Sequence, residues 1–355
     1  MRIFAPSAVW FLTAEIGKET QRTQRKKKNP NQIQMVLSLP LKTWPGRIRE
    51  VTVGRTAEKG GTRTSTVTIG GENALPFHHF EGTIPHRPAI AFEIPDIDPS
   101  HWPETVREPY RTVLGDPVAW AKLVVEKYGA KIICLNFIGA NPDKQNRPIA
   151  ECVEVFKAVL CAVGVPIMVQ GYGPGEKNSE LLAKCAEVSR GEGIVLASAV
   201  AEHYKTLAAA TIAYDCILVA ETPIDVNLAK QLNILLSDMN VPPERIIMDP
   251  LTGGLGYGFE YTYSVMERIR LQALGGDAMM SMPFVNFIGQ ETWKTKEVKV
   301  PESLEPTWGP ELERGVLWEA ITAHGLLLAG SNLLIMRHPT AIRQVENAID
   351  DLMKC

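Results

Sequence analysis

The stretch CILVAETPIDVNLAKQLNILLSDM, residues 216–239, contains the unit from which the fold can be predicted. Its first residues are almost all apolar, which is typical of a buried strand in a parallel sheet. Its second half places Leu228, Leu232, Leu235 and Leu236 on one side of a helix. We therefore expect a strand followed by a helix, joined by the short turn TPID.

The same alternation of strand-like and helix-like segments continues from Arg87 to the end of the chain. Eight apolar strand-like runs occur, at PAIAFEI (88–94), KIICLNF (131–137), PIMVQGY (166–172), GIVLAS (193–198), CILVAE (216–221), RIIMDP (245–250), AMMSMP (278–283) and NLLIMR (332–337). Eight such units over about 250 residues predict a closed (β/α)8 barrel, or TIM barrel. A doubly wound open sheet is the alternative, but the turn after the first run, IPDIDPSHWPE, lacks the G-x-G-x-x-G fingerprint of that fold.

The residues before the barrel divide into two segments. REVTVGR and TRTSTVTIGG alternate in character on either side of EKGG, which predicts a β-hairpin within residues 47–70. We expect residues 35–86 to form a hairpin segment packed on a barrel that spans residues 87–355. Residues 1–34 are a short apolar run and then a basic, aperiodic one, which predicts a disordered extension or an over-extended gene model.

The composition excludes several classes of protein. The formal net charge of −3 argues against nucleic acid as a partner. The apolar share of 45% is ordinary for a globular protein with an ample core. No apolar run reaches the roughly 18 residues that a membrane-spanning helix needs, so no membrane is expected. The six cysteines include no C-x-x-C pair, which indicates reduced thiols in a cytoplasmic protein.

Polar residues follow the predicted strands, and in this fold the active face is built from such positions. The set is rich in amides and hydroxyls and poor in charge, which favours hydrogen bonding to a large ligand over a metal site: Asp96, Asp98, Asn136, Asn141, Gln170, Tyr172, Ser198, Glu202, Thr222, Asp225, Asn227, Asp249, Thr252 to Gly258, Ser281, Asn286, Arg337 and His338. An aldolase-like barrel would need a lysine at a strand end for a Schiff base, and none of the eight runs ends in lysine.

The stretch MDPLTGGLGYG, residues 248–258, has four glycines in its last six residues. Glycine is costly in ordered backbone, so such a cluster predicts either that a ligand approaches the backbone closely or that several residues have positive φ angles. A flexible surface turn is the alternative. The candidate cofactor-binding residues are therefore taken from this loop and from two other strand ends: Asp225, Asn227, Asp249, Thr252, Gly253, Gly254, Gly256, Tyr257, Arg337 and His338. Three have alternative roles: Asn227 as a helix cap, Asp249 as a turn cap, and Arg337 as the partner of a phosphate or a carboxylate.

Four segments closely resemble the small (delta) subunit of the corrinoid iron–sulfur protein of the carbon monoxide dehydrogenase/acetyl-CoA synthase system. They are GGENALPFHHFEGTIPHRPAIAFEIPDI, AETPIDVNLAKQLNILLSDMN, IIMDPLTGGLGYGFEYTYSVMERIRLQALGGD and GVLWEAITAHGLLLAG. The resemblance extends from about Met35 to the C-terminus and does not include residues 1–34.

This resemblance implies a TIM barrel paired with a large subunit that carries a 4Fe-4S cluster and most contacts to a cobamide, a corrinoid of the vitamin B12 type. The barrel would cap the cobamide at the subunit interface and carry no iron–sulfur cluster, in keeping with the missing C-x-x-C and D-x-H-x-x-G motifs. The pair would accept a methyl group from methyl-tetrahydrofolate, or a pterin analogue, through a methyltransferase. It would deliver that group to acetyl-CoA synthase in the reductive acetyl-CoA (Wood–Ljungdahl) pathway.

Two functions remain open at this point. In the first, the chain is a subunit of the methyl carrier that is not catalytic alone. In the second, it is a pterin-dependent corrinoid methyltransferase barrel that acts itself. Asp225, Asn227 and Asp249 would then hold the pterin ring, which needs paired donors and acceptors at fixed geometry.

Overall fold

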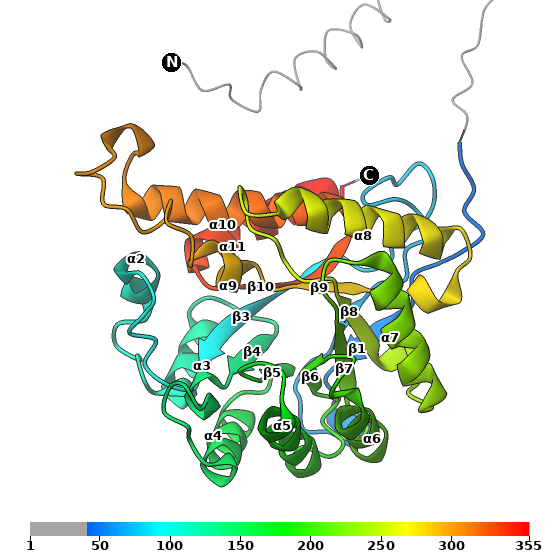
Figure 1. Ribbon diagram of the computed structural model, residues 1–355, viewed down its shortest axis with the longest axis horizontal. Coiled ribbons are helices and arrows are strands. Elements are labelled where there is room, and N and C mark those ends of the chain that lie inside the picture. The colour runs from blue at the N-terminus through cyan, green and yellow to red at the C-terminus, as the bar shows by residue number, and fades with distance from the viewer. Residues whose placement is uncertain (1–40, 355) are drawn as a thin grey trace, which may run out of the picture. The chain divides into compact units, whose positions relative to one another are not determined.

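Eight parallel strands close into a barrel in the order β10-β3-β4-β5-β6-β7-β8-β9 (Figure 1). The strands are β3 (Ala89–Pro95), β4 (Ile133–Asn136), β5 (Ile167–Gln170), β6 (Val195–Ala199), β7 (Ile217–Glu221), β8 (Ile246–Asp249), β9 (Phe284–Asn286) and β10 (Ser331–Met336). A helix that covers the outside of the barrel follows each strand: α3 (Pro117–Glu126), α4 (Ile149–Ala162), α5 (Glu176–Val188), α6 (Tyr204–Tyr214), α7 (Val226–Asp238), α8 (Phe259–Leu274), α10 (Glu311–Leu328) and α11 (Pro339–Leu352). The predicted (β/α)8 barrel is confirmed.

The structure describes residues 41–354. The predicted extension of residues 1–34 lies outside this range. Among the helices of residues 41–354, none is long and apolar enough to cross a membrane.

Alternate residues of each strand face two different cores. Side chains that point outward pack under the helices, while those that point inward fill the barrel, as the two-residue period of a strand requires. The inner cluster includes Ala91, Cys134, Met168, Val195, Val219, Ile247, Val285, Leu333 and Ile335. Because both faces of each strand are buried, the strands are apolar throughout, which is the pattern seen in the sequence.

The predicted N-terminal hairpin is confirmed as a two-stranded antiparallel sheet of β1 (Val51–Val53) and β2 (Val67–Ile69). Val51, Val53 and Ile69 belong to the inner cluster of the barrel. The hairpin therefore closes the end of the barrel at which the strands begin.

Hydrogen bonds tie the hairpin segment to the loops that enter the strands. The Gly54 N–H donates to the Gly193 carbonyl at 2.9 Å, and the Thr64 N–H donates to the Gly164 carbonyl at 2.8 Å. The buried guanidinium of Arg63 pairs with Glu192 at 2.8 Å. These contacts seal one end of the barrel and leave the opposite end, where the strands finish, as the open one.

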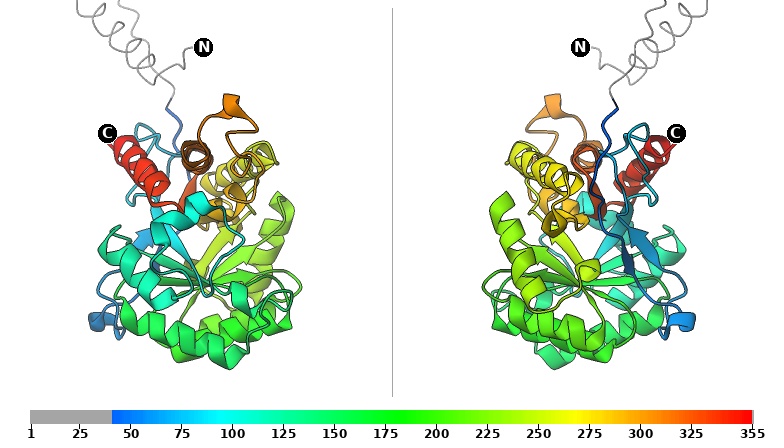
Figure 2. Two further views of the ribbon diagram at one scale, coloured as in Figure 1. Left: turned by 90° about the vertical axis from the view of Figure 1, so that its left-hand side faces the viewer. Right: turned by 90° about the vertical axis from the view of Figure 1, so that its right-hand side faces the viewer.

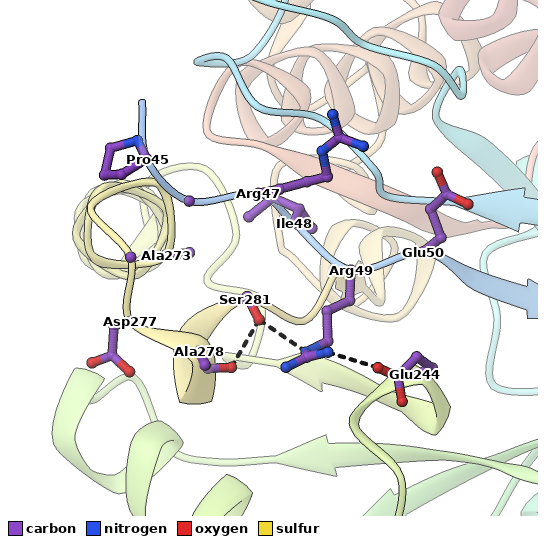
Figure 3. Close-up of a pocket in the computed structure, with 12 residues that line it drawn as sticks. Pro45, Arg47, Ile48, Arg49, Glu50, Glu244, Ala273, Asp277, Ala278 and Ser281 are labelled. Carbon is purple, nitrogen blue, oxygen red and sulfur yellow. Dashed lines mark hydrogen bonds and ion pairs between the residues drawn. The ribbon is translucent and has the colours of Figure 1, made fainter. Parts of the chain in front are cut away.

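The seventh strand differs from its prediction. Residues Ala278–Met280 of AMMSMP form the short 3-10 helix η5, and the strand is β9, the following segment. Ser281 consequently lies at the closed end, where its hydroxyl accepts a hydrogen bond from Arg49 Nε at 3.1 Å (Figure 3). The prediction that Ser281 belongs to the open face is wrong, because methionine and alanine suit a helical turn as well as a strand.

Candidate functional site

A cavity of about 390 Å³ opens where the barrel strands end, and we call this end the mouth. The left view of Figure 2 looks onto it. Residues from all eight strand ends or the loops after them line the cavity: His101, Asn136, Ile138, Asn141, Gln170, Gly171, Tyr172, Gly173, Pro174, Asn178, Ala197, Ser198, Val200, Glu221, Asp249, Leu251, Thr252, Phe287, Gln290, Glu291 and Arg337. Most polar members are neutral amides and hydroxyls, so the mouth can form many hydrogen bonds with little net charge.

Two carboxylates lie side by side in the cavity wall. Glu221 ends β7 and Asp249 ends β8, and the two residues are direct partners in the register of these parallel strands. Burial raises the pKa of Asp249 well above its usual value, and the nearby Glu221 raises it further. Burial also raises the pKa of Glu221, against the opposing effect of a hydrogen bond with Ser198. The pair can therefore share a proton and present a donor beside an acceptor.

Arg337 also lines the cavity, and buried partners hold its guanidinium. Its Nε and Nη2 donate to the two carboxylate oxygens of Glu93 at 2.7 and 2.8 Å. Asn136 Nδ2 donates to the same carboxylate at 2.8 Å, and the guanidinium stacks 4.0 Å above the ring of Trp102. Of the two roles expected for this arginine, the structure has the pairing with a carboxylate.

Glu319 of α10 fixes the backbone that leads from β10 into α11. Its buried carboxylate accepts the backbone N–H groups of Arg337 at 2.6 Å and His338 at 3.1 Å, and Trp293 Nε1 at 2.9 Å. Burial raises the pKa of Glu319 to about 7, although these three donors oppose the rise. Glu319 thus sets the position from which Arg337 reaches the mouth.

The glycine-rich loop folds back on itself between β8 and α8. The carbonyl of Gly254 accepts the N–H groups of Tyr257 at 2.9 Å and Phe259 at 3.1 Å. Gly256 and Gly258 have φ angles of 74° and 95°, a region that glycine adopts without strain. A side chain on Gly253 would begin 2.4 Å from the Gly258 carbonyl oxygen. The internal geometry of the loop therefore accounts for three of its four glycines.

Gly253→Ala and Gly254→Ala compare a glycine that the packing of the loop requires with one that it does not require. We expect Gly253→Ala to lower the free energy of unfolding by about 1–3 kcal/mol, since the added methyl meets backbone that cannot move aside freely. Gly254→Ala is the matched control, because its added carbon has no neighbour closer than 3.8 Å. Urea unfolding of both variants measures the difference, and equal losses would contradict this account of the loop.

The structure brings three of the ten candidate residues together at the mouth cavity: Asp249, Thr252 and Arg337. Thr252 is committed to its neighbours, because its hydroxyl oxygen accepts the Phe287 N–H at 3.1 Å and lies 3.3 Å from Asn286 Nδ2. Asp249 also makes the expected turn contact, since its Oδ1 accepts the Leu251 N–H at 2.9 Å.

The other candidates are not among the residues that line this cavity. Asp225, rather than Asn227, is the N-cap of α7, and its Oδ1 accepts the N–H groups of Asn227 and Leu228. Its carboxylate lies one residue before the helix and so reaches both N–H groups. His338 caps α11 and lines a separate cavity beside α2 (Glu104–Arg107). Gly253, Gly254, Gly256 and Tyr257 lie further along the loop, where the Tyr257 hydroxyl hydrogen-bonds with Glu297.

Sequence reasoning missed Glu221, Glu93, His101 and Gln290. Glu221 is the last residue of a predicted strand, so reading the final strand residue as well as the residues after it would have found it. Glu93 is an acid within an otherwise apolar strand, which is itself a signal, since a buried charge needs a partner. His101 lies in the loop after β3 and Gln290 in the short helix α9 (Ile288–Thr292) after β9. The sequence has no pattern that indicates that these two side chains turn toward the mouth.

The mouth is suited to hydrogen bonding with a neutral or weakly charged ligand. The side-chain amides of Asn136, Asn141, Gln170 and Gln290 supply both donors and acceptors there. Within residues 41–354, no group of three or more His, Cys, Asp and Glu side chains could hold a metal ion. The cavity volume suits a small heterocycle or one face of a larger ring.

Comparison with known proteins links this barrel to one family. A family model described as CO dehydrogenase/acetyl-CoA synthase delta subunit matches residues 50–341. The delta subunit of the acetyl-CoA decarbonylase/synthase complex of Archaeoglobus fulgidus is 40% identical over 314 residues, which are 87% of this chain and 69% of that protein. The corresponding delta subunit of Methanothermobacter thermautotrophicus is 34% identical over 305 residues, 86% of this chain and 75% of the relative.

Solved structures support the fold independently of these sequences. Dihydropteroate synthase from Xanthomonas albilineans, solved with 4-aminobenzoic acid, aligns with a TM-score of 0.50 at 14% identity. The alignment covers 76% of this chain and 93% of the synthase. At this identity the likeness extends to the barrel architecture alone.

Proposed function

Because this chain belongs to the family of CO dehydrogenase/acetyl-CoA synthase delta subunits, we propose that it is the smaller subunit of a corrinoid iron–sulfur methyl carrier. A larger subunit holds the cobamide and a 4Fe-4S cluster, and the mouth of this barrel caps the cobamide. The pair accepts a methyl group from methyl-tetrahydrofolate or a pterin analogue through a methyltransferase. It passes that group to acetyl-CoA synthase.

The mouth cavity is the observation that carries this proposal. When bound, the corrinoid supplies a strongly nucleophilic cobalt that takes up and gives back the methyl group. The amides of Asn136, Gln170 and Gln290 would hold the ring by hydrogen bonds to its amide side chains. The guanidinium of Arg337 is already neutralised by Glu93, so it brings no unpaired charge to a dry interface.

Native purification of this chain from its own source tests the proposal. We expect one equivalent of a larger iron–sulfur protein to co-elute, with about one cobalt per pair. Cobalt and iron analysis of the peak, together with mass spectrometry of both chains, gives the composition. A chain that elutes alone and without cobalt would overturn the carrier function.

A second function, pterin binding by this chain itself, is favoured by the carboxylate pair. A pterin edge has N–H donors next to an acceptor nitrogen, and Glu221 with Asp249 can present the complementary acceptor and donor. Titration of the isolated chain with methyl-tetrahydrofolate, followed by fluorescence or calorimetry, distinguishes the two functions. The carrier subunit alone is expected to show no binding.

Asp249→Asn probes the carboxylate pair through stability as well as binding. Since the pKa values of both acids are raised in the folded state, wild-type stability falls as the pH rises above their unfolded values, near 4. The amide removes one of the two acids and keeps the acceptor for the Leu251 N–H. We expect the variant to be more stable than wild type at pH 8 by about 1 kcal/mol, as is common when a functional site is neutralised.

Asp225→Asn is the matched control for this substitution. Asparagine caps a helix about as well as aspartate, and Asp225 does not line the cavity, so stability and pterin binding should both stay unchanged. Unfolding in urea at pH 5 and pH 8 measures all three proteins. A lower stability of Asp249→Asn at pH 8 would contradict a strained carboxylate pair.

A further inference from the structure

The loop between β5 and α5 brings the start of a helix to the mouth. This loop has the sequence GYGPG (171–175), and its residues 171–174 line the mouth cavity. Helix α5 begins directly after the loop and is 13 residues long. Among the residues that the structure describes, no acceptor meets the backbone N–H groups of Glu176, Lys177 and Asn178. Such N–H groups attract an anion, because the helix dipole places partial positive charge on them.

The side chain of Asn178 adds a donor that also lacks a partner. Asn178 is 2% exposed, and the cavity that it lines is the mouth. Its Oδ1 accepts the Tyr172 N–H at 3.1 Å, which fixes the orientation of the amide. Within residues 41–354, Nδ2 makes no hydrogen bond, although it is not one of the fully enclosed polar atoms. The mouth is therefore where an acceptor for this donor can lie.

Lys177 gives this side of the mouth a positive charge. Its Nζ donates to the Ala140 carbonyl at 2.8 Å and to Asn146 Oδ1 at 2.7 Å, and both acceptors are neutral. Within the described part of the chain, Lys177 has no salt bridge to a carboxylate. Arg147, in the same loop as Asn146, pairs instead with Asp96 at 3.2 Å. The charge of Lys177 thus remains available to a ligand.

Two glycines before the helix leave open space. Gly173 and Gly175 have φ angles of 143° and 142°, and a Cβ at either position would meet no atom within 4 Å. Gly171 differs, because its Cβ would collide with the side chain of Asn178. Packing within the chain therefore accounts for Gly171 and not for the other two. The acidic Glu176 lines a different cavity, which α5 forms with α6.

We propose that the GYGPG loop and the first turn of α5 form an anion subsite of the mouth, which holds a phosphate or carboxylate group of the ligand. The backbone N–H groups and Asn178 Nδ2 donate to the anionic oxygens, and Lys177 supplies the opposite charge. The inference rests on the proposed function only in taking the mouth as the ligand site. The carboxylate pair of Glu221 and Asp249 ends β7 and β8, which β6 separates from β5. A ligand that reaches both places carries N–H donors at one end and an anionic group at the other.

Titration of the isolated full-length chain with inorganic phosphate, and separately with glutarate, tests the subsite. Ionic strength is held constant with sodium chloride, and the backbone amide NMR resonances of residues 175–179 are followed. We expect a saturable shift of these resonances with at least one of the two anions and none with chloride alone. Tighter binding of phosphate assigns a phosphate group to the subsite, and tighter binding of glutarate assigns a carboxylate.

Lys177→Gln and Lys184→Gln form a matched pair on one helix. Lys184 pairs with Glu187 at 2.9 Å and does not line the mouth. We expect Lys177→Gln to weaken anion binding about fivefold, since one partly exposed charge is lost, while Lys184→Gln keeps wild-type affinity.

Asn178→Asp is a second variant that tests the side-chain donor. Aspartate keeps the acceptor for the Tyr172 N–H and is favourable in the first turn of a helix, so the fold should be retained. The change replaces Nδ2 with a negatively charged oxygen, and anion binding should be lost.

Three outcomes would overturn the subsite: no saturable shift in wild type, equal affinities of the two lysine variants, or wild-type affinity of Asn178→Asp. Each of them leaves the carrier function standing, because no corrinoid or partner takes part in the titration. A native chain that elutes without cobalt would instead refute the carrier function and leave the anion subsite in place.

Discussion

Replacing Glu93 with alanine is expected to remove about 3–5 kcal/mol from the free energy of unfolding, because it leaves the buried guanidinium of Arg337 without its carboxylate. Glu93 and Arg337 are 1% and 6% exposed, so solvent cannot replace the lost partner. The variant also loses the hydrogen bond from Asn136. Urea unfolding measures this loss. A lower midpoint with an unchanged m-value would show that stability alone has changed.

Two controls identify the cause of this loss. Glu93→Ala combined with Arg337→Met removes both charges, and we expect it to be more stable than Glu93→Ala alone. Glu244→Ala breaks the exposed ion pair with Arg49 at the closed end of the barrel and should cost no more than about 1 kcal/mol (Figure 3). Equal losses for Glu93→Ala and Glu244→Ala would contradict the central role of the buried pair.

Glu319→Gln is expected to cost about 2–4 kcal/mol although glutamine has nearly the same shape. Both carboxylate oxygens of Glu319 accept N–H groups, from Arg337 on one side and from His338 and Trp293 on the other. A side-chain amide has one nitrogen donor, which must face at least one of these N–H groups in either orientation. A buried donor is then left without an acceptor.

The pH dependence provides a second measure of the same residue. The pKa of Glu319 is about 7 in the folded state and near 4.5 when exposed, so the folded protein binds the proton more tightly. Wild-type stability should therefore fall as the pH rises from about 4.5 to 7. Glu319→Gln should lack this component, and its stability relative to wild type should rise over that range.

Glu313→Gln, on the exposed side of the same helix, is the matched control for Glu319→Gln. It should change stability by less than about 0.5 kcal/mol at any pH in this range. Thermal or urea unfolding at pH 5 and pH 7.5 makes the comparison. Similar behaviour of the two variants would mean that the three hydrogen bonds to Glu319 contribute little.

Most of the fold could be predicted because its signals are local. Seven of the eight predicted strands overlap the observed ones, since each has a continuous apolar run of the length that a buried strand needs. The remaining one, the seventh run AMMSMP, was wrong because methionine and alanine do not distinguish a strand from a helical turn. Nothing else in the composition of this run indicates whether it forms a strand or a helical turn. The contact between Ser281 and Arg49 joins residues far apart in the sequence, so the residues around Ser281 do not predict it.

The candidate site was only partly predictable, because local signals place some of its residues while contacts between distant strands decide its chemistry. Asp249 and Arg337 follow apolar strands, so their place at the mouth follows from the barrel alone. The residues that give them their chemistry come from other strands: Glu221 lies beside Asp249 only through the register of β7 and β8, and Glu93 pairs with Arg337 across 244 residues. A glycine cluster in the sequence likewise does not show whether its glycines allow contact with a ligand or are required by the conformation of the loop.

The sequence by itself determined the (β/α)8 architecture, the hairpin before it and the polar character of the strand ends. These properties depend on neighbours two to four residues apart, which a one-dimensional pattern records directly. Only the tertiary structure decided which carboxylates meet, which end of the barrel the hairpin closes, and which side chains line the mouth. Those outcomes depend on contacts between distant segments, and the free energy of such contacts is set by burial and pairing that no local pattern contains.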